Sequence, residues 1–379
     1  MSYVRPVRGA VWRTVVATAA AATVVATISC GGTGTEGPGF DAPPSSGAGG
    51  SSSGASPSVT SATSVAAASG AGGSSGSGGG GGAAALGPPY PIVLAHGFFG
   101  FEAFAGLDFA TYFYGVREHL ADHGEVQVYT PAVDPFNDST HRGAQLRAAI
   151  EHVVATTGHA KVNIIGHSQG GLDARVVAHD RPDLVASVIS LQTPHGGAPL
   201  ADVALGLTQN PALGDALDWI VQTFGAGLYD AIDGDTSISA ALGQFSTPAI
   251  ADFDARYPDD PSVFYASIAG RSDWSLGGPA CNVSGAPPFI SAWIGERDPI
   301  DPLFSFTEAL TDGGFGDPYP NDGLVRVVDA RHGLFLGCLP ADHTDMIGHL
   351  FGDGPGGGND WDYAQFYIDL VAWLRAAGY

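Results

Sequence analysis

The segment around Ser168 constrains the fold more than any other feature of the sequence. Residues 166–170 read Gly-His-Ser-Gln-Gly, which matches the pattern G-x-S-x-G. A strand-like run at 161–165 leads directly into this pentapeptide, and a helix-like stretch at 171–179 follows it. Glycines let the chain turn sharply there, which places the serine on a strained, exposed elbow. The strand–turn–helix context makes the pattern specific, whereas a glycine-rich turn with a solvated serine is the competing interpretation.

Strands and helices are expected to alternate around this elbow. Apolar runs at 91–95, 126–130 and 184–191 have the length and composition of strands. Between the second of these runs and the strand-like run at 161–165, Ser139 or Thr140 is expected to cap a helix whose apolar residues at 146, 150, 153 and 154 recur at helical spacing, and Gly158 ends it. Strands that are apolar on both faces and alternate with helices predict a mostly parallel sheet covered by helices.

Composition divides the chain into a leader, a linker and one large domain. No Asp, Glu, Lys or Arg occurs between residues 42 and 101, where Gly, Ser and Ala predominate. Such a stretch buries too little apolar surface to offset the entropy of ordering it, so 30–87 is expected to be a disordered linker. The domain is expected at 88–379, a length that buries roughly three quarters of its surface.

Residues 1–29 have the form of a bacterial export signal. Three arginines among the first 13 residues precede an uncharged, alanine-rich run at 14–29 that is too short for a membrane span. Residues 27–31 resemble a lipoprotein cleavage box with Cys30 as the lipidated residue, although Thr27 stands where an aliphatic residue is usual. We expect an exported protein: an outer-membrane or cell-surface lipoprotein tethered to the membrane through Cys30, or an extracellular protein after ordinary cleavage. An uncleaved anchor is the remaining alternative. The linker would reach roughly 40 Å.

The charge balance excludes several classes of partner. The formal net charge is −23, and it becomes −26 once the three signal arginines are removed. Lys161 is the only lysine of the chain. This balance argues against binding of nucleic acid and against electrostatic docking on anionic lipid.

Two cysteines remain once Cys30 is assigned to the cleavage box. In an exported protein an isolated pair predicts one disulfide, between Cys281 and Cys338. The alternative is two buried free thiols.

A serine hydroxyl becomes nucleophilic only when a base takes its proton, and an acid must orient that base. Where a serine sits on such an elbow, the acid and then the histidine follow along the chain. His343 is the favoured base for Ser168, and Asp322 is the favoured acid. Local sequence does not single out either residue, because the chain has 12 histidines and because Asp342 and Asp345 lie close to His343. His332 and His349 remain alternatives for the base.

The charge that develops on the substrate oxygen needs two preset backbone N–H groups. Gln169, which follows the nucleophile, is expected to supply one. Phe98, which follows the first strand in His96-Gly97-Phe98, is expected to supply the other. We expect His96 to brace this loop through hydrogen bonds rather than to take part in the chemistry.

Several ordered motifs together resemble the true lipases of Pseudomonas and Burkholderia. They lie at 90–97, 166–171, 193–196, 253–258 and 321–325, and the resemblance covers essentially 88–379. It implies an α/β-hydrolase fold with a helical lid insertion, and its triad falls on Ser168, Asp322 and His343. It also implies hydrolysis of acylglycerol esters at an oil–water interface and, as in some members, a lipase-specific foldase.

Other functions on the same scaffold are a short-chain esterase, a polyester depolymerase or a phospholipase. A surface lipoprotein without enzymatic activity is the remaining class, and the intact catalytic positions argue against it.

The resemblance further implies a structural calcium ion that braces the histidine loop. Its carboxylate ligands would be Asp345 and Asp301, with Asp298 as the competitor of Asp301. Main-chain carbonyls of His349 and Asp353 would complete the site, although the family usually has Gln at the position of His349. Carboxylate and carbonyl oxygens are the ligands that calcium prefers.

The region 201–235 corresponds to the lid of the similar lipases. Leu217, Ile220, Val221 and Phe224 recur at the spacing of one helical stripe. Such a helix would gain apolar burial on meeting lipid. The alternative is a helix packed permanently on the sheet.

Overall fold

The described part of the protein, in a computed structural model, comprises residues 85–98, 112–199, 201–202, 242–272, 279–298, 319–349 and 359–379, with residues 304, 307, 308 and 311. By its internal contacts the chain divides after Gly78, and every described residue belongs to the second unit, Gly79–Tyr379. The expected signal, Cys30 and nearly all of the expected linker and lid lie outside the described residues. Near the start of the described residues, the backbone of Leu86 is hydrogen-bonded to a later segment. Its N–H donates to the carbonyl of Gly158, and its carbonyl accepts from the N–H of Ala160.

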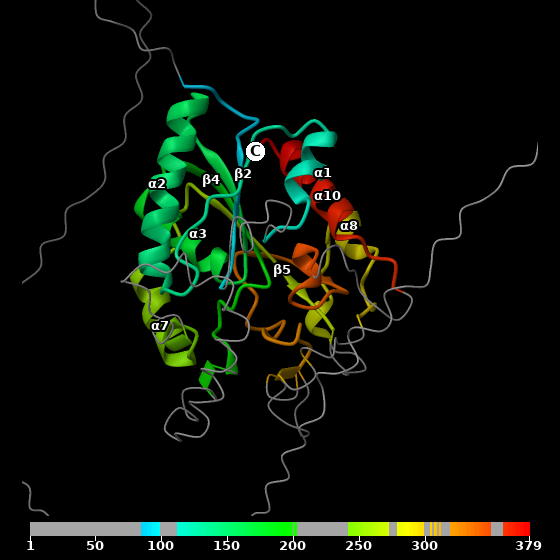
Figure 1. The fold of residues 1–379 in the computed structure, drawn as a ribbon. Coiled ribbons are helices and arrows are strands. Elements are labelled where there is room, and N and C mark those ends of the chain that lie inside the picture. The colour runs from blue at the N-terminus through cyan, green and yellow to red at the C-terminus, as the bar shows by residue number, and fades with distance from the viewer. Residues whose placement is uncertain are drawn as a thin grey trace, which may run out of the picture. The chain divides into compact units, whose positions relative to one another are not determined.

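Six described strands form one parallel sheet in the order β2-β1-β3-β4-β5-β6 (Figure 1). They are β1 (Ile92–Ala95), β2 (Val128–Tyr129), β3 (Val162–His167), β4 (Val185–Leu191), β5 (Phe264–Gly270) and β6 (Leu334–Leu339). β2 forms one edge of the sheet. After β2 the chain crosses back over β1, and β3, β4, β5 and β6 then follow in sequence order on the other side of β1. β2 is shorter than the expected 126–130, because Val126 is exposed at this edge of the sheet.

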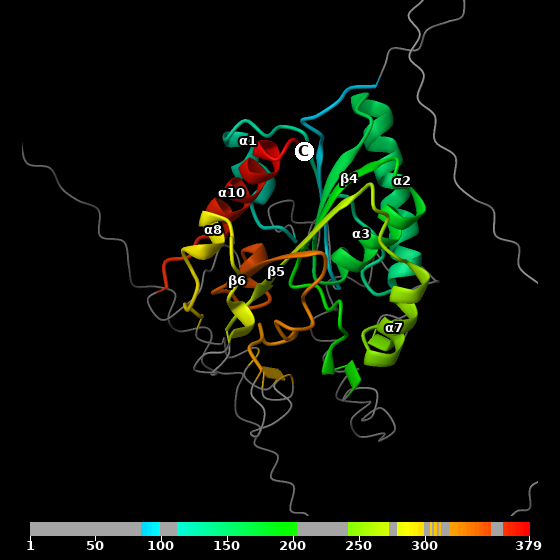
Figure 2. The same ribbon diagram turned by 180° about the vertical axis from the view of Figure 1, so that it is seen from behind.

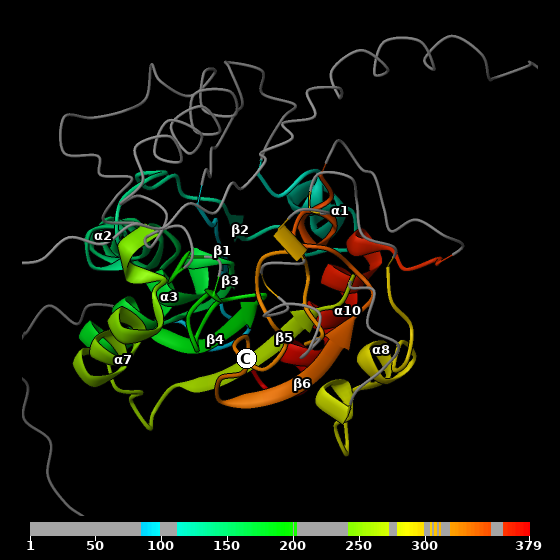
Figure 3. The same ribbon diagram turned by 90° about the horizontal axis from the view of Figure 1, so that it is seen from below.

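Helices cover both faces of the sheet (Figures 2 and 3). On one face lie α2 (Ser139–Thr157), α3 (Gln169–Asp180) and α7 (Thr247–Arg256); on the other lie α1 (Val116–Asp122), α8 (Pro288–Ser291) and α10 (Tyr363–Ala376). Two 3-10 turns are η2 (Pro279–Cys281) and η3 (Asp345–Ile347). The α/β fold class expected from the sequence is confirmed.

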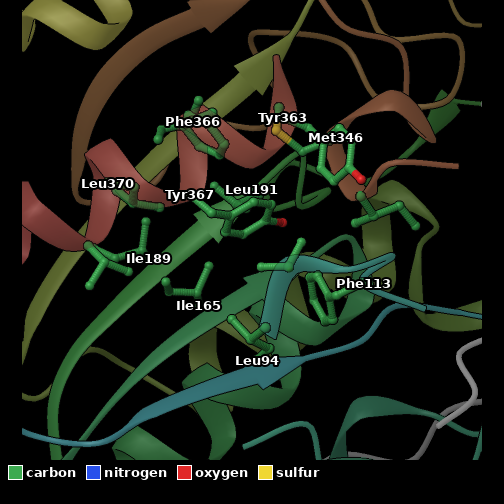
Figure 4. Packing of buried hydrophobic residues seen from close by; sticks show 14 of the residues in the cluster. Leu94, Phe113, Ile165, Ile189, Leu191, Met346, Tyr363, Phe366, Tyr367 and Leu370 are labelled. Atoms are coloured by element: carbon green, nitrogen blue, oxygen red, sulfur yellow. The ribbon is translucent and has the colours of Figure 1, made fainter. Parts of the chain in front are cut away.

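Alternate residues of each central strand enter opposite halves of the core, as the pleat of a strand requires. Leu94, Ile165 and Ile189 point to the face covered by α10, where Tyr367 and Leu370 are fully buried (Figure 4). The opposite face of the same strands packs on α2 and α3 through a second set that includes Val93, Ile164, Val188, Leu146 and Val177. Full burial of each such side chain contributes about 1.5–3 kcal/mol, so strands that are apolar on both faces are stable only between two helical layers.

The longest described helix, α2, ends at the expected Gly158, but its N-cap is Asp138 rather than the expected Ser139 or Thr140. The carboxylate of Asp138 accepts a hydrogen bond from the N–H of His141 at 2.9 Å and so caps the first turn. Gly158 ends the helix in the left-handed conformation, with φ of 76°. Within the described ranges, no helix has the length and apolar character needed to cross a membrane.

Candidate active site

Ser168 stands between the end of β3 and the start of α3, at the carboxyl edge of the sheet. Its φ of 53° is in the left-handed region, which is costly for a residue with a side chain and marks a strained turn. The backbone N–H of Ser168 donates to the carbonyl of Leu191 at 2.9 Å, which ties the elbow to β4. Gly170 is required because a Cβ there would lie 2.1 Å from the carbonyl oxygen of Ala95. The glycine of the motif therefore lets α3 start directly against β1.

The structure brings the favoured acid and base together. Nδ1 of His343 lies 2.8 Å from Oδ2 of Asp322, and both residues are buried. The other oxygen, Oδ1 of Asp322, accepts hydrogen bonds from the N–H groups of Leu324 and Val325 at 2.9 and 2.7 Å. The N–H of His343 also donates to the carbonyl of Asp322 at 3.0 Å. This arrangement keeps the proton on Nδ1, which leaves Nε2 of His343 as the proton acceptor.

The same histidine lies beside the nucleophile elbow. The ring of His167, the residue before Ser168, packs against the ring of His343 with centroids 4.7 Å apart. The two alternative bases have other partners. Nε2 of His332 pairs with Asp259 at 3.0 Å, and the ring of His349 contacts Tyr114.

The two residues that are expected to supply the N–H donors of the oxyanion hole, Phe98 and Gln169, directly follow Gly97 and Ser168 in the chain. A Cβ placed on Gly97 would lie 2.7 Å from the Cβ of Ser168, so the backbone that leads into Phe98 touches the nucleophile. Gln169 is the first residue of α3, and the amino end of a helix favours negative charge. The ring of Phe98 meets Phe136 and Phe245 edge-on, at 5.6 and 6.4 Å between centroids.

A buried arginine of α2, which the sequence analysis does not single out, holds the oxyanion loop. Arg142 donates to the carbonyl oxygens of His96 and Asp134 at 2.6 Å each, and to the carboxylate of Asp173 at 2.8 Å. Burial raises the pKa of Asp173 to about 6, although the guanidinium of Arg142 opposes this change. Helix α2 has two arginines, Arg142 and Arg147, and nothing in the local sequence shows which of them is buried, so Arg142 is missed.

His96 braces the same loop, as expected. Its Nε2 accepts from the N–H of Val133 at 3.0 Å, and its Nδ1 lies 2.9 Å from the carbonyl oxygen of Gly97. Burial, aided by the nearby charge of Arg142, lowers the pKa of His96 to about 3, so this ring is neutral at ordinary pH.

Comparisons with known proteins agree with this geometry. A family profile described as alpha/beta hydrolase fold matches residues 90–227. A triacylglycerol lipase of Vibrio cholerae is 34% identical over 268 residues, which cover 69% of this chain and 81% of the relative. The chain belongs to the triacylglycerol lipase family. Other relatives of the same name are those of Burkholderia plantarii, at 31% identity over 69% of this chain and 80% of the relative, and Pseudomonas fragi, at 30% over 76% and 97%.

Among solved structures, a Staphylococcus hyicus lipase superposes with a TM-score of 0.51 at 16% identity, covering 77% of this chain and 97% of that one. This likeness shows the fold alone. Together with the family membership, it confirms the resemblance, the α/β-hydrolase fold and the class of serine ester hydrolases that the sequence predicts.

Three buried carboxylates lie next to the histidine loop of this family member. Oxygen atoms of Asp298, Asp342 and Asp345 all lie within 4.8 Å of one another. Burial, with the charges of Asp342 and Asp298, raises the pKa of Asp345 to about 9. The sequence favours Asp301 over Asp298 as the partner of Asp345, but Asp301 lies outside the described residues, and so does Asp353.

Asp342 is the member of this cluster that sequence reasoning misses. Its Oδ1 accepts hydrogen bonds from the N–H groups of Thr344 and Asp345 at 2.7 and 2.9 Å, which folds the histidine loop into a tight turn. His349, whose carbonyl is an expected calcium ligand, is buried at the end of this turn, with its N–H donating to Thr344.

The expected disulfide between Cys281 and Cys338 is present. It joins η2 to β6, the strand that leads into the histidine loop, and both cysteines are buried. The disulfide prediction is confirmed, and the alternative of two free thiols is wrong.

Proposed function

We propose that the protein hydrolyses the carboxylic esters of acylglycerols through an acyl-enzyme on Ser168. The observation that carries this proposal is the hydrogen-bonded pair of His343 and Asp322 beside the serine elbow, in a chain whose relatives are named triacylglycerol lipases. Nε2 of His343 takes the hydroxyl proton while the serine oxygen attacks the ester carbonyl. The imidazolium then gives this proton to the departing alcohol, which leaves the acyl group on Ser168.

Water completes the cycle. His343 takes a proton from the water that attacks the acyl-enzyme, and returns it to the serine oxygen as the fatty acid leaves. Asp322 stabilises the imidazolium in both halves. The N–H groups of Phe98 and Gln169 would bind the oxyanion of both tetrahedral intermediates, where one such donor is worth about 10²–10³ in rate.

The substrate class rests on the expected lid at 201–235 and on the family. Hydrolysis should be measured on esters of increasing acyl length, each below and above the concentration at which an emulsion forms. We expect activity on long-chain triacylglycerols that rises sharply when the interface appears. A rate that peaks on the shortest chains and ignores the interface would instead identify a short-chain esterase, and preference for polyester or for phospholipid would identify those activities.

We further propose a structural calcium ion at the acidic cluster. Asp298, Asp342 and Asp345 offer hard oxygen ligands, the chemistry that calcium prefers. Burial, together with the charges of Asp342 and Asp298, raises the pKa of Asp345, and a bound cation would favour its ionised form instead. Bound there, calcium would add positive charge that holds the histidine loop closed. The carbonyls of His349 and Asp353 remain the proposed further ligands.

Three variants test the calcium site. Because a bound ligand stabilises the folded state, calcium should raise the Tm of the wild type and of Asp301→Asn, and chelator should lower it. Asp298→Asn and Asp345→Asn should melt at the same temperature with and without calcium. A wild-type Tm indifferent to both additions would remove the site. Loss of the calcium effect in Asp301→Asn, with its retention in Asp298→Asn, would assign the ligand to Asp301.

We also propose that the enzyme is exported and is held at a membrane through lipidated Cys30, with the linker as a tether. Cys30→Ser should release the enzyme into the medium with unchanged specific activity. Retention of this variant on the membrane would contradict the tether. Coexpression with a lipase foldase would show whether secretion of the active enzyme depends on such a partner.

A further inference from the structure

Gln192 has a backbone conformation that its sequence position does not explain. It directly follows β4, is fully buried, and has a φ of 51°. Among the described residues, Ser168 is the only other non-glycine residue with a positive φ. A residue with a side chain is retained in this strained region only where the surroundings hold it there, which most often happens at functional sites.

The side-chain amide of Gln192 connects two catalytic segments. Its Oε1 lies 3.0 Å from Nε2 of His167, the residue before the nucleophile. Its Nε2 lies 2.9 Å from the carbonyl oxygen of Asp342, the residue before the base. Space for the amide comes from Gly270 on β5, where a Cβ would lie 1.8 Å from Nε2 of Gln192.

The carbonyl oxygen of Asp342, at the end of this connection, determines which atom donates and which accepts in each of its hydrogen bonds. A carbonyl only accepts, so the amide nitrogen of Gln192 donates to Asp342 and its oxygen faces His167. Nε2 of His167 therefore carries the proton, and Nδ1 accepts from the hydroxyl of Tyr112 at 2.7 Å. Burial and the adjacent His343 lower the pKa of His167 well below its usual value, which keeps this ring neutral as the connection requires.

The connection reaches both the proposed base and the oxyanion loop. The ring of His167 packs on that of His343. At the other end, the hydroxyl oxygen of Tyr112 is 2.6 Å from where a Cβ on Gly97 would lie, so it abuts the oxyanion loop. Three loops from distant parts of the sequence are thus linked by one buried row of side chains.

We propose that Gln192 is a positioning residue that sets the distance between the Ser168 elbow and the His343 loop. It touches neither the substrate nor the reacting atoms, and it acts by holding Nε2 of His343 where the serine proton is transferred. A misplacement of about 1 Å at a reacting group costs on the order of 100-fold in rate. This inference rests on the triad proposed above.

Two substitutions remove the connection while tolerating the backbone. Gln192→Gly accepts a positive φ without strain, and Gln192→Asn also tolerates this region but is one methylene too short to reach both partners. Gln244→Ala is the matched control, because it removes another side-chain hydrogen bond, from the N–H of Ser139 to Oε1 of Gln244. All variants are compared with calcium in excess, on a soluble chromogenic ester.

We expect kcat of both Gln192 variants to fall about 10- to 100-fold, with KM within twofold of the wild type. Their rate of labelling by a fluorophosphonate should fall in step, and the Tm of Gln192→Gly should stay within a few degrees, because relief of the strained φ offsets the lost hydrogen bonds. Gln244→Ala should keep its kcat.

An unchanged kcat in both Gln192 variants would overturn the positioning role. So would a loss of kcat that appears only where Tm has also collapsed, since that describes a purely structural amide. A wild type that neither hydrolyses esters nor reacts with the fluorophosphonate would instead overturn the proposed function, so the two failures are distinguishable.

Discussion

At the scale of single residues, the described part of the protein contains two His–Asp pairs, and the one that adjoins the elbow is buried. His343 pairs with Asp322 at 2.8 Å, and His332 pairs with Asp259 at 3.0 Å. The pairs are alike in length, so what distinguishes them is position. The ring of His343 packs on His167 at the nucleophile, whereas that of His332 stacks on His195.

The variant Asp322→Asn should lower kcat about 10⁴-fold, because an amide that donates to Nδ1 of His343 forces the proton onto Nε2, the atom that must accept from the serine. Asp259→Asn is the matched control and should leave kcat near the wild-type value. Initial rates on a soluble ester measure both. The reverse outcome, with activity lost in Asp259→Asn and kept in Asp322→Asn, would make His332 the base.

The sequence singles out the residues that we propose to react, but not those that hold them. Ser168 is predictable because its turn needs glycines at fixed positions, and chain order narrows the choice of Asp322 and His343. Arg142 and Gln192 act through backbone carbonyls of segments far away in the sequence. No local pattern encodes such contacts, so only the fold reveals them.

At the scale of elements, prediction succeeds where a segment is long and capped. The extent of α2 follows from the apolar repeat and Gly158, although its cap is Asp138 rather than the expected Ser139 or Thr140. The sequence does not single out β6, because Gly337, with φ of 129°, interrupts the run of strand-forming residues. The register between β5 and β6 also shifts near the same place. Because such a shift depends on the neighbouring strand, the sequence of β6 alone does not predict it.

The loop after β4 and the loop before β6 meet through a pair of histidine rings. His195 stacks on His332 with centroids 4.4 Å apart, and Nδ1 of His195 lies 3.4 Å from the guanidinium of Arg175. Burial lowers the pKa of His195 well below its usual value, and His332 and Arg175 act in the same direction. The ring of His195 is therefore neutral in the folded state, whereas in the unfolded chain the same ring takes up a proton near pH 6.5.

The variant His195→Gln should therefore differ from the wild type in its dependence on pH. Below pH 6.5 the wild type loses free energy of unfolding relative to the variant, by up to about 1.4 kcal/mol per pH unit, because only its unfolded state gains this proton. Above pH 6.5 the difference should be constant. Denaturant unfolding between pH 5 and 8 measures it, and parallel curves for the two proteins would contradict the neutral buried ring.

At the scale of the whole molecule, the carboxyl ends of β1, β3, β4 and β6 lead into the loops of the site, which is where open parallel sheets place their ligands. The oxyanion loop, the elbow, Gln192 and the histidine loop follow these strand ends in turn. The disulfide and the acidic cluster both adjoin the last of them, the loop that is farthest along the chain from the elbow.

Removal of the disulfide should destabilise the protein through this loop. The Cys281–Cys338 bond closes a segment with a sequence separation of 57, for which loop-closure entropy predicts about 4 kcal/mol. Denaturant unfolding of the double variant Cys281→Ser/Cys338→Ser should show a loss of up to about this size, and addition of reductant to the wild type should reproduce it. Equal stability of the two proteins would mean that the bond contributes nothing.

The most direct measurement is the site of covalent labelling by a fluorophosphonate, located by mass spectrometry of the digested protein. We expect one adduct on Ser168, with loss of ester hydrolysis in proportion to the labelled fraction, and no adduct in Ser168→Ala. The absence of any adduct in the wild type, or hydrolysis that survives in Ser168→Ala, would contradict the assignment of Ser168 as the nucleophile.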